Sequence, residues 1–447
     1  MPKKKKTSAF PYPVFTEDMR RTHTVLVPNM LPVHFSLIER IFNAYGYHCE
    51  VLHNEGSRVV ECGLQYVHND TCYPALLTIG QFLDALQSGK YDTHRVALML
   101  SQTGGGCRAS NYISLLRKAL EKAGYGYVPV ISFNISGLDH SPGFRLTLPM
   151  LYRMMYALLY GDLLMTLRAQ CRPYEITAGQ TDALVRRWTE RLVSEMTRKR
   201  VSYSRVLQNY REILRDFAAV ERKQEERVRV GIVGEIYVKF SPLGNNGLED
   251  FLVAQGAETV MPGLLDFCLY SVYNSIADRK LYGVAPVKAA GARILYRFLT
   301  RKQQDMIDCI REHGVFRPMA PFDETRAGIR GIIGIGAKMG EGWLLPAEMV
   351  ELIHGGVGNI VCAQPFGCLP NHIMGKGVMK PIKERFPGVN IVAVDYDPGA
   401  SRINQENRIK LMLANAVRSA NAARTQEAHK GAKGANTEKE ENAYVMA

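Results

Sequence analysis

The chain has 447 residues, of which 46% are hydrophobic and 22% charged, a composition typical of a globular protein with two or three domains. Nine cysteines, an odd number scattered between Cys49 and Cys368, argue against a disulfide framework and for metal, redox or core roles. The net charge of +13 comes with no zinc-finger, RNA-recognition or helix-turn-helix signature, so we do not expect a nucleic-acid partner. An acidic protein, or the phosphates of a nucleotide-like thioester carrier, explains the charge as well.

The N-terminus and the most apolar stretch argue against export and membrane insertion. Lysines 3–6 are followed by Phe10-Pro11-Tyr12-Pro13 and not by the apolar core of a signal peptide. The apolar stretch 146–167 is interrupted by Arg153 and Asp162, which suits a buried helix better than a bilayer span. We therefore expect a cytoplasmic protein that does not enter a membrane.

The first predicted elements alternate between strands and helices. After a flexible arm over residues 1–20, apolar runs predict strands and amphipathic periodicity predicts helices. Strands are expected at 23–28, 47–52, 95–100 and 127–131, a further short extended run at Arg58–Cys62, and helices at 35–45, 73–86 and 112–123. This βαβ rhythm predicts a Rossmann-like domain with a mainly parallel sheet over residues 21–143.

A helical segment and a second α/β unit follow. Residues 144–226 show helical patterns without a strand signal and predict a helical domain. Strands are then expected at 227–234, 258–262, 359–363 and 389–395, helices at 247–255, 271–313, 345–354 and 404–415, and a glycine-rich loop at 331–336. Residues 227–416 are the predicted second domain, and 417–447 the predicted disordered tail, because that segment cannot bury apolar area. The fold class is α/β, with two Rossmann-like parallel-sheet domains and a helical domain between them.

Three cysteines are expected in turns that follow strands or extended runs. Cys368 follows the apolar run 358–362 and a Pro/Phe/Gly loop, Cys107 follows three glycines after a strand, and Cys72 lies at the expected start of a helix, which favours the thiolate. Ligands of open α/β sheets bind at the carboxyl ends of strands, so these thiols are site candidates. Plainer interpretations are a buried small hydrophobe for Cys72 and an ordinary flexible turn at Cys107. Cys362, at the end of a strand, suits a second ligand and a packed core thiol equally.

The remaining residues with metal-binding potential carry weaker signals. Five further cysteines fall in apolar patterns and are expected in the core: Cys49, Cys62, Cys171, Cys268 and Cys309. No C-x-x-C pair is present, and three or four thiols from separate strand ends suit an iron–sulfur cluster better than structural zinc. His68 and His372 are reserve nitrogen donors, or simply hydrogen-bonding loop residues. The sequence has no phosphate-binding loop, so we do not expect the chain itself to hydrolyse ATP.

Four motifs together resemble one family. They are Asn69-Asp70-Thr71-Cys72-Tyr73-Pro74, Gly106-Cys107-Arg108-Ala109-Ser110-Asn111-Tyr112, Gly244-Asn245-Asn246-Gly247 and Gln364-Pro365-Phe366-Gly367-Cys368-Leu369-Pro370-Asn371-His372. With these motifs the sequence resembles the activase-related branch of the 2-hydroxyacyl-CoA dehydratase superfamily, whose relatives include benzoyl-CoA reductase and double-cubane cluster proteins. The resemblance covers about residues 20 to 415.

The resemblance implies a cofactor, partners and ligands. It implies an oxygen-sensitive iron–sulfur cluster, either [4Fe–4S] or a fused double-cubane form, held by Cys72, Cys107 and Cys368, with Cys362 as a candidate fourth thiolate. It also implies an actin-like ATPase activase as electron donor, a homo- or heterodimer of like subunits, and a small-molecule or acyl-CoA substrate. The sequence departs from the pattern of long family members because it carries no actin-like ATPase module and shows no identifiable acyl-CoA pocket.

Three functional hypotheses follow from the sequence. The first is an iron–sulfur dehydratase or reductase that receives low-potential electrons from the activase. The second is a non-catalytic component that stores electrons or binds within a larger complex. The third, suggested only by the charge, is a zinc-stabilised nucleic-acid binder whose binding would depend steeply on salt.

Overall fold

The computed structural model describes residues 12–68, 70–134, 141–198 and 201–418. Residues 1–11 of the predicted arm and 419–447 of the predicted tail lie outside that part of the chain. Within the described residues, no helix combines the length and the apolar character needed to cross a bilayer. The fold class is α/β, with two four-stranded parallel sheets and many helices.

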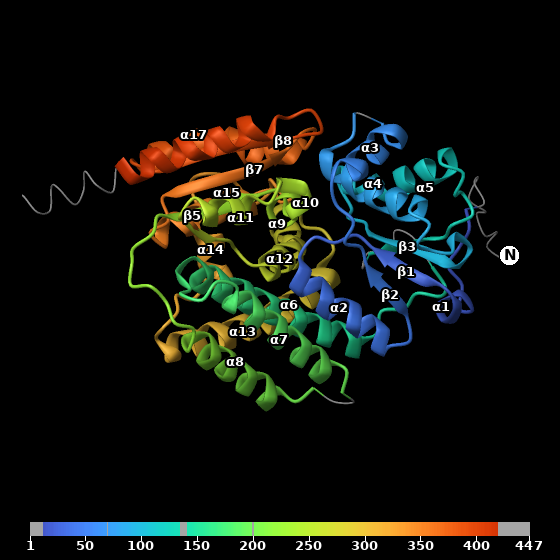
Figure 1. Cartoon of the computed structure of the whole chain (residues 1–447), viewed down its shortest axis with the longest axis horizontal. Helices are drawn as coiled ribbons and strands as arrows, with labels where there is room; N and C mark the ends of the chain where they lie inside the picture. Colours follow the sequence, from blue (N-terminus) through green and yellow to red (C-terminus); the bar gives the residue numbers. More distant parts are fainter. Residues whose placement is uncertain (1–11, 69, 135–140, 199–200, 419–447) are drawn as a thin grey trace, which may run out of the picture.

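The first sheet is built from the N-terminal third of the chain, at the right of Figure 1. Its strands are β1 (Thr24–Val27), β2 (His48–Val51), β3 (Val96–Ser101) and β4 (Val130–Phe133), in the order β2-β1-β3-β4. Its helices are α1 (Met19–Thr22), α2 (Pro32–Ala44), α3 (Ser57–Tyr66), α4 (Tyr73–Gln87) and α5 (Tyr112–Lys122). Strand β4 starts three residues later than predicted, because Pro129 has no N–H to contribute to a sheet and its carbonyl accepts from Leu98 N instead.

The second sheet repeats this topology. Its strands are β5 (Arg229–Gly234), β6 (Glu258–Val260), β7 (Asn359–Pro365) and β8 (Asn390–Tyr396), in the order β6-β5-β7-β8. Its helices are α9 (Ile236–Phe240), α10 (Pro242–Asn245), α11 (Leu248–Ala254), α15 (Leu344–His354), α16 (Leu369–Met374) and α17 (Met379–Arg385), and residues 402–418 are also helical. In both sheets the second strand is added on one side of the first strand and the later strands on the other side. The ligand-binding crevice of such a sheet lies at this switch point, at the carboxyl ends of β1 and β3, and of β5 and β7.

The predicted extended run Arg58–Cys62 is wrong, because this segment belongs to helix α3. Its buried residues Val59, Cys62 and Gly63 have the i, i+3, i+4 spacing of one helix face. The β-branched pair Val59 and Val60 gave the segment the local composition of a strand, whereas packing against α4 stabilises the helix.

Helix α4 lies between the two sheets and is buried over almost its whole length. One side of α4, with Ile79 and Phe82, belongs to the core of the first sheet. The other side, with Leu76 and Leu77, packs in one cluster with strands β5 and β7. A helix that is apolar all round is expected only where protein covers every face, so α4 joins the two halves of the molecule.

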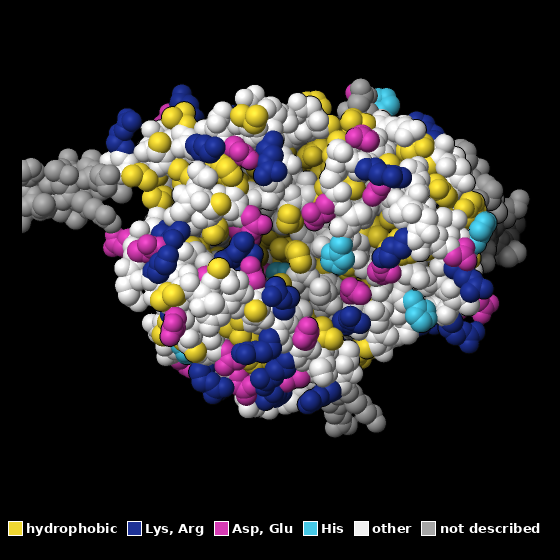
Figure 2. Space-filling view, in the orientation of Figure 1, with side chains coloured by type: hydrophobic (Ala, Val, Ile, Leu, Met, Phe, Trp, Pro, Cys, Tyr) yellow, Lys and Arg dark blue, Asp and Glu magenta, His cyan; other side chains and the backbone are white. Residues whose placement is uncertain are grey.

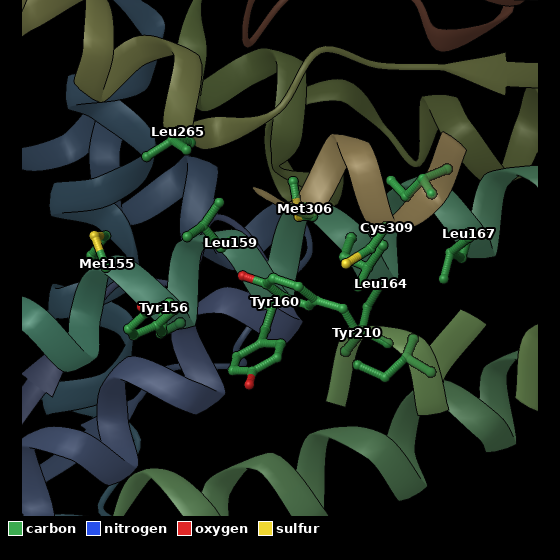
Figure 3. Close-up of a cluster of buried hydrophobic side chains, with 14 of the residues drawn as sticks. Met155, Tyr156, Leu159, Tyr160, Leu164, Leu167, Tyr210, Leu265, Met306 and Cys309 are labelled. Carbon is green, nitrogen blue, oxygen red and sulfur yellow. The ribbon is translucent and has the colours of Figure 1, made fainter. Parts of the chain in front are cut away.

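The third body is helical and is assembled from two separate segments, seen in the lower part of Figure 1. The segments contribute α6 (Leu148–Cys171), α7 (Gln180–Met196) and α8 (Tyr203–Ala218), followed much later by α12 (Leu264–Tyr282), α13 (Pro286–His313) and α14 (Phe322–Gly328). Figure 3 shows their shared core, which includes Tyr160 of α6, Tyr210 of α8 and Cys309 of α13. Helices α12 to α14, which the sequence analysis placed within 227–416, therefore pack on the helices of 144–226.

Candidate cysteine site

Each of the three predicted thiols precedes a helical turn. Cys72 is the N-cap of α4, Cys107 precedes the 3-10 turn Arg108–Asn111 that leads into α5, and Cys368 is the N-cap of α16. All three have extended backbone, as N-cap residues do, and the prediction that Cys72 starts a helix is confirmed. Their sulfurs interact with backbone N–H groups of the first turns, from Ala75, Ala109 and Asn371 respectively.

The segments that carry these cysteines meet at one place. Tyr73 N donates to Phe366 O at 3.0 Å, which ties the Cys72 segment to the Cys368 loop. Gly106 N contacts Met339 Sδ at 3.0 Å, and a Cβ on Gly340 would lie 3.1 Å from Pro370 Cβ and 4.0 Å from Cys107 Sγ. The Cys72 thiol interacts electrostatically with both Cys107 and Cys368. The structure thus brings the three cysteines into one neighbourhood, in which Cys72 and Cys368 are buried and Cys107 is half-buried.

Two glycines allow this approach of backbone segments. Gly367 has φ of +73°, and a Cβ there would lie 3.0 Å from Thr71 O and 3.2 Å from Cys72 Cα. Gly340 has φ of +60° and faces Pro370. A larger residue at either position would be strained in its backbone and would push the Cys72, Cys107 and Cys368 segments apart.

Three side chains complete the neighbourhood, and the sequence analysis did not single them out. Tyr112 Oη lies 2.9 Å from Cys72 Sγ. Glu235 follows β5 directly and caps α9, with its carboxylate accepting from Val238 N at 2.9 Å, and Glu341 accepts from Ile236 N at 3.0 Å. Both carboxyls act electrostatically on Cys107 and Cys368. The rule that ligands bind at the carboxyl ends of strands, applied to all polar residues, would have found Glu235.

Burial and these carboxyls control the ionisation of the thiols. Burial, followed by the nearby Glu341, raises the pKa of Cys107 to about 11 and that of Cys368 further. Burial also raises the pKa of Cys72, against the hydrogen bond from Tyr112. Burial and the neighbouring Glu341 raise the pKa of Glu235 to about 8. These shifts favour the protonated thiols, so a cationic group that binds them must displace protons.

Cys362 is not brought into this neighbourhood. Its side chain points to the other face of the second sheet, where it packs with Met349, Val350 and Ile382. Burial raises the pKa of its thiol to about 12, and the nearest charged groups acting on it include Asp395 and Glu348. As a fourth thiolate it would require rearrangement of that core, so this assignment stays a prediction.

The other metal-binding candidates lie outside the site. The five cysteines expected in the core pack there, Cys268 partly so: Cys49, Cys62, Cys171, Cys268 and Cys309. His68 pairs with Asp70 on the surface at 3.4 Å. His372 bonds to the amide of Gln364, one turn beyond Cys368. Neither of these contacts joins a histidine to one of the three thiols.

Within the described ranges, no group of three or more His, Cys, Asp or Glu side chains is arranged around one point as a single metal ion requires. In a cubane each cysteine binds a different iron, so its sulfurs stand further apart than around one ion. Cys72 and Cys368 are buried, and Cys107 is half-buried. Searches against protein-family models and curated proteins gave no match.

Arginines of helices α7 and α8 are paired with acidic side chains. Figure 2 shows Lys and Arg beside Asp and Glu over helices α7 and α8. Arg187 pairs with Asp216 at 3.0 Å, and Arg205 pairs with Glu195 at 2.7 Å. This surface is a mixed-charge network and lacks the one-sided basic face of a nucleic-acid binder.

Proposed function

We propose that this chain is an iron–sulfur protein whose cluster is held by Cys72, Cys107 and Cys368 at the junction of its two sheets. The observation that carries the proposal is the meeting of three thiols, from segments far apart in the sequence, at the carboxyl ends of β3, β5 and β7. Such convergence is expected for a site and not for core cysteines, which lie wherever apolar packing places them.

The surrounding residues support this assignment chemically. Tyr112 can donate a hydrogen bond to a Cys72 thiolate, and the backbone N–H groups of Ala75, Ala109 and Asn371 are placed to do the same for each sulfur. Such donors stabilise the extra negative charge of a reduced cluster. Glu235 and Glu341 can hold the protons that the thiols release or that a reaction consumes.

When bound, a cluster with three protein thiolates supplies an electron and one iron open to an oxygen or thioester ligand. We accordingly propose a reductase or dehydratase of the 2-hydroxyacyl-CoA dehydratase type, built on two Rossmann-like domains and acting in the cytoplasm on a small, acyl-CoA or similar, substrate. Its low-potential electrons would come from an ATP-dependent activase, and its assembly would be a dimer of like subunits. The alternative is an electron-storage subunit without turnover.

Anaerobic reconstitution with iron and sulfide tests the proposal. The wild type should develop the broad visible absorption of an iron–sulfur protein and, after reduction, an EPR signal, whereas Cys107→Ser should lose most of both. Cys309→Ser, in the core of the helical body, is the matched control and should resemble the wild type. The assignment is contradicted if Cys107→Ser keeps the absorption and the EPR signal, or if the wild type develops neither.

Turnover separates the two candidate functions. Reduced, reconstituted protein is mixed with acetylene, azide, hydrazine or a 2-hydroxyacyl-CoA, and product formation is followed together with reoxidation of the cluster. A reductase forms product and oxidises its cluster as substrate is consumed, whereas a dehydratase forms product without net oxidation because loss of water is redox-neutral. A storage subunit keeps its electron with every one of these compounds and passes it only to a protein acceptor.

A further inference from the structure

Helix α13 carries two apolar stripes, of which only one faces the core. On the inner side Ala289, Tyr296 and Leu299 are buried. On the outer side Val287 is 85% exposed and Ile294 74%, and Phe298 continues the same line. The spacing of these three residues, i, i+7 and i+11, places them on one narrow face of a helix. The outer stripe has no packing role within the described part of the chain.

The turn between α12 and α13 extends this stripe into a patch. Leu281, Tyr282 and Val284 are all exposed there, directly before the start of α13. Contiguous exposed apolar residues are uncommon on a protein that functions alone, whereas single ones are normal. We call the patch formed by Leu281, Tyr282, Val284, Val287, Ile294 and Phe298 the hairpin patch.

The positive charge around the hairpin patch indicates the kind of partner that would bind it. Residues 279–302 contain seven Lys or Arg residues and no Asp or Glu. A second copy of the chain docked symmetrically on this patch would oppose basic residues with basic residues, which is unfavourable. The stripe is also narrow, like the seam of a helix–helix contact, whereas helices that lie on membranes present a broad apolar face. The complementary occupant is therefore an amphipathic helix with acidic flanks on another protein.

The hairpin patch is linked to the cysteine site by direct contacts. A Cβ on Gly336 would lie 3.3 Å from Tyr282 Oη, and Lys338 pairs with Asp278 near the end of α12. The next residue, Met339, contacts Gly106 N beside Cys107. A partner seated on the patch would thus lie next to the loop that covers the thiols.

We propose that the hairpin patch docks an acidic amphipathic helix of a partner protein beside the cysteine site. The proposal rests on the proposed function, because that position matters for a partner which exchanges electrons with the cluster. Binding itself requires only the folded chain, so it can be measured with or without iron.

The test uses the full chain and two synthetic helical peptides of the same apolar stripe, one flanked by Glu and one by Lys, in fluorescence anisotropy. The wild type should bind the Glu-flanked peptide, more weakly as salt rises, and should not bind the Lys-flanked one. The double variant Val287→Glu/Ile294→Glu should lose at least tenfold in affinity. Leu148→Glu, at an 82% exposed site on α6, should stay within twofold of the wild type.

Several results would overturn the proposal. They are equal binding of both peptides, or retained binding by the double variant with unchanged circular dichroism. Self-association of the wild type in sedimentation, abolished by the double variant, would assign the patch to a second copy. Binding to phosphatidylserine vesicles without peptide binding would assign it to a membrane surface. The iron and sulfide contents of the double variant and the wild type are measured as well. If they are equal, a loss of peptide binding cannot be attributed to loss of the cluster.

Discussion

Tyr112 is the side chain through which the protein can adjust a cluster most directly. Its hydroxyl lies 2.9 Å from Cys72 Sγ, and both groups are buried. A hydrogen bond donated to a ligand sulfur stabilises the reduced state more than the oxidised state, because the reduced cluster carries more negative charge. The neighbouring helix N–H groups act in the same direction. The polar contacts of the three cysteines therefore bear on the redox potential of the site.

Replacing Tyr112 by Phe should lower the reduction potential of the reconstituted protein. A lost hydrogen bond of about 1 kcal/mol corresponds to about 40 mV for a one-electron couple. The measurement is an EPR-monitored redox titration. Tyr125→Phe, a change on the same domain outside the site, is the control, and an equal shift in both variants would contradict a specific role for Tyr112.

Glu235 should make the stability of the cluster-free protein depend on pH. Burial and Glu341 raise its pKa to about 8 in the folded chain, from about 4.5 for an ordinary glutamate. A carboxyl with a raised pKa stabilises the folded state below about pH 4.5, and this contribution is lost as pH rises toward 8. The free energy of unfolding of Glu235→Gln, relative to the wild type, should therefore be higher at pH 8 than at pH 5, by on the order of a few kcal/mol. Urea unfolding at the two pH values measures this, and parallel pH profiles would refute it.

At the scale of elements, the α3–α4 pair sets the position of Cys72. A Cβ on Gly80 of α4 would lie 2.1 Å from Val59 O of α3, and a Cβ on Gly63 would lie 2.5 Å from Leu76 O. The two glycines allow the helix backbones to touch, so that α4 fits between both sheets with Cys72 at its start. This contact is also why α3 forms a helix despite its two adjacent valines.

Gly80→Ala should destabilise the protein by at least about 2 kcal/mol, because the added methyl group overpacks the helix crossing. It should also weaken reconstitution of the cluster, since α4 would move away from the second sheet. Gly291→Ala is the control, as a Cβ there meets nothing within 4 Å in another helix, α13. Thermal unfolding of both variants gives the comparison, and equal melting temperatures would show that the crossing tolerates a side chain.

The sequence allowed prediction of the elements with strong local signals. Most strands and helices, and the start of α4 at Cys72, follow from periodicity and from turn residues. The helix α3 was mistaken for a strand, and the association of α12 to α14 with α6 to α8 was missed. Both depend on which element covers an apolar face, and a pattern of apolar residues does not contain that information. Tyr112 and Glu341 were missed for the same reason, since each reaches the thiols through tertiary packing.

At the scale of the whole molecule, Asp162 joins two helices of the helical body, α6 and α12, to α2 of the first sheet unit. Its carboxylate lies 2.9 Å from His34 Nε2 of α2 and accepts from Leu264 N at 2.8 Å and Leu265 N at 3.0 Å, at the start of α12. All these atoms are buried. A single carboxylate thereby fixes α2, α6 and α12, the last of which carries the hairpin patch at its far end.

Asp162→Ala should destabilise the folded chain by about 3 to 5 kcal/mol, because it leaves His34 and two helix N–H groups buried without a partner. Asp18→Ala removes a carboxylate whose ion pair with Arg21 is exposed, and should change stability by less than about 1 kcal/mol. Denaturant unfolding measures both. A small effect of Asp162→Ala would mean that apolar contacts alone hold α2 on the helical body.

The central claim is that Cys72, Cys107 and Cys368 hold one inorganic cluster between the two sheets. The most direct measurement is the content of iron and acid-labile sulfide per chain after strictly anaerobic purification, in the wild type and in Cys72→Ser, Cys107→Ser, Cys368→Ser and Cys309→Ser. The account predicts matching amounts of iron and sulfide in the wild type and in Cys309→Ser, with most of both lost in each of the other three variants. A wild-type protein free of iron and sulfide would contradict it.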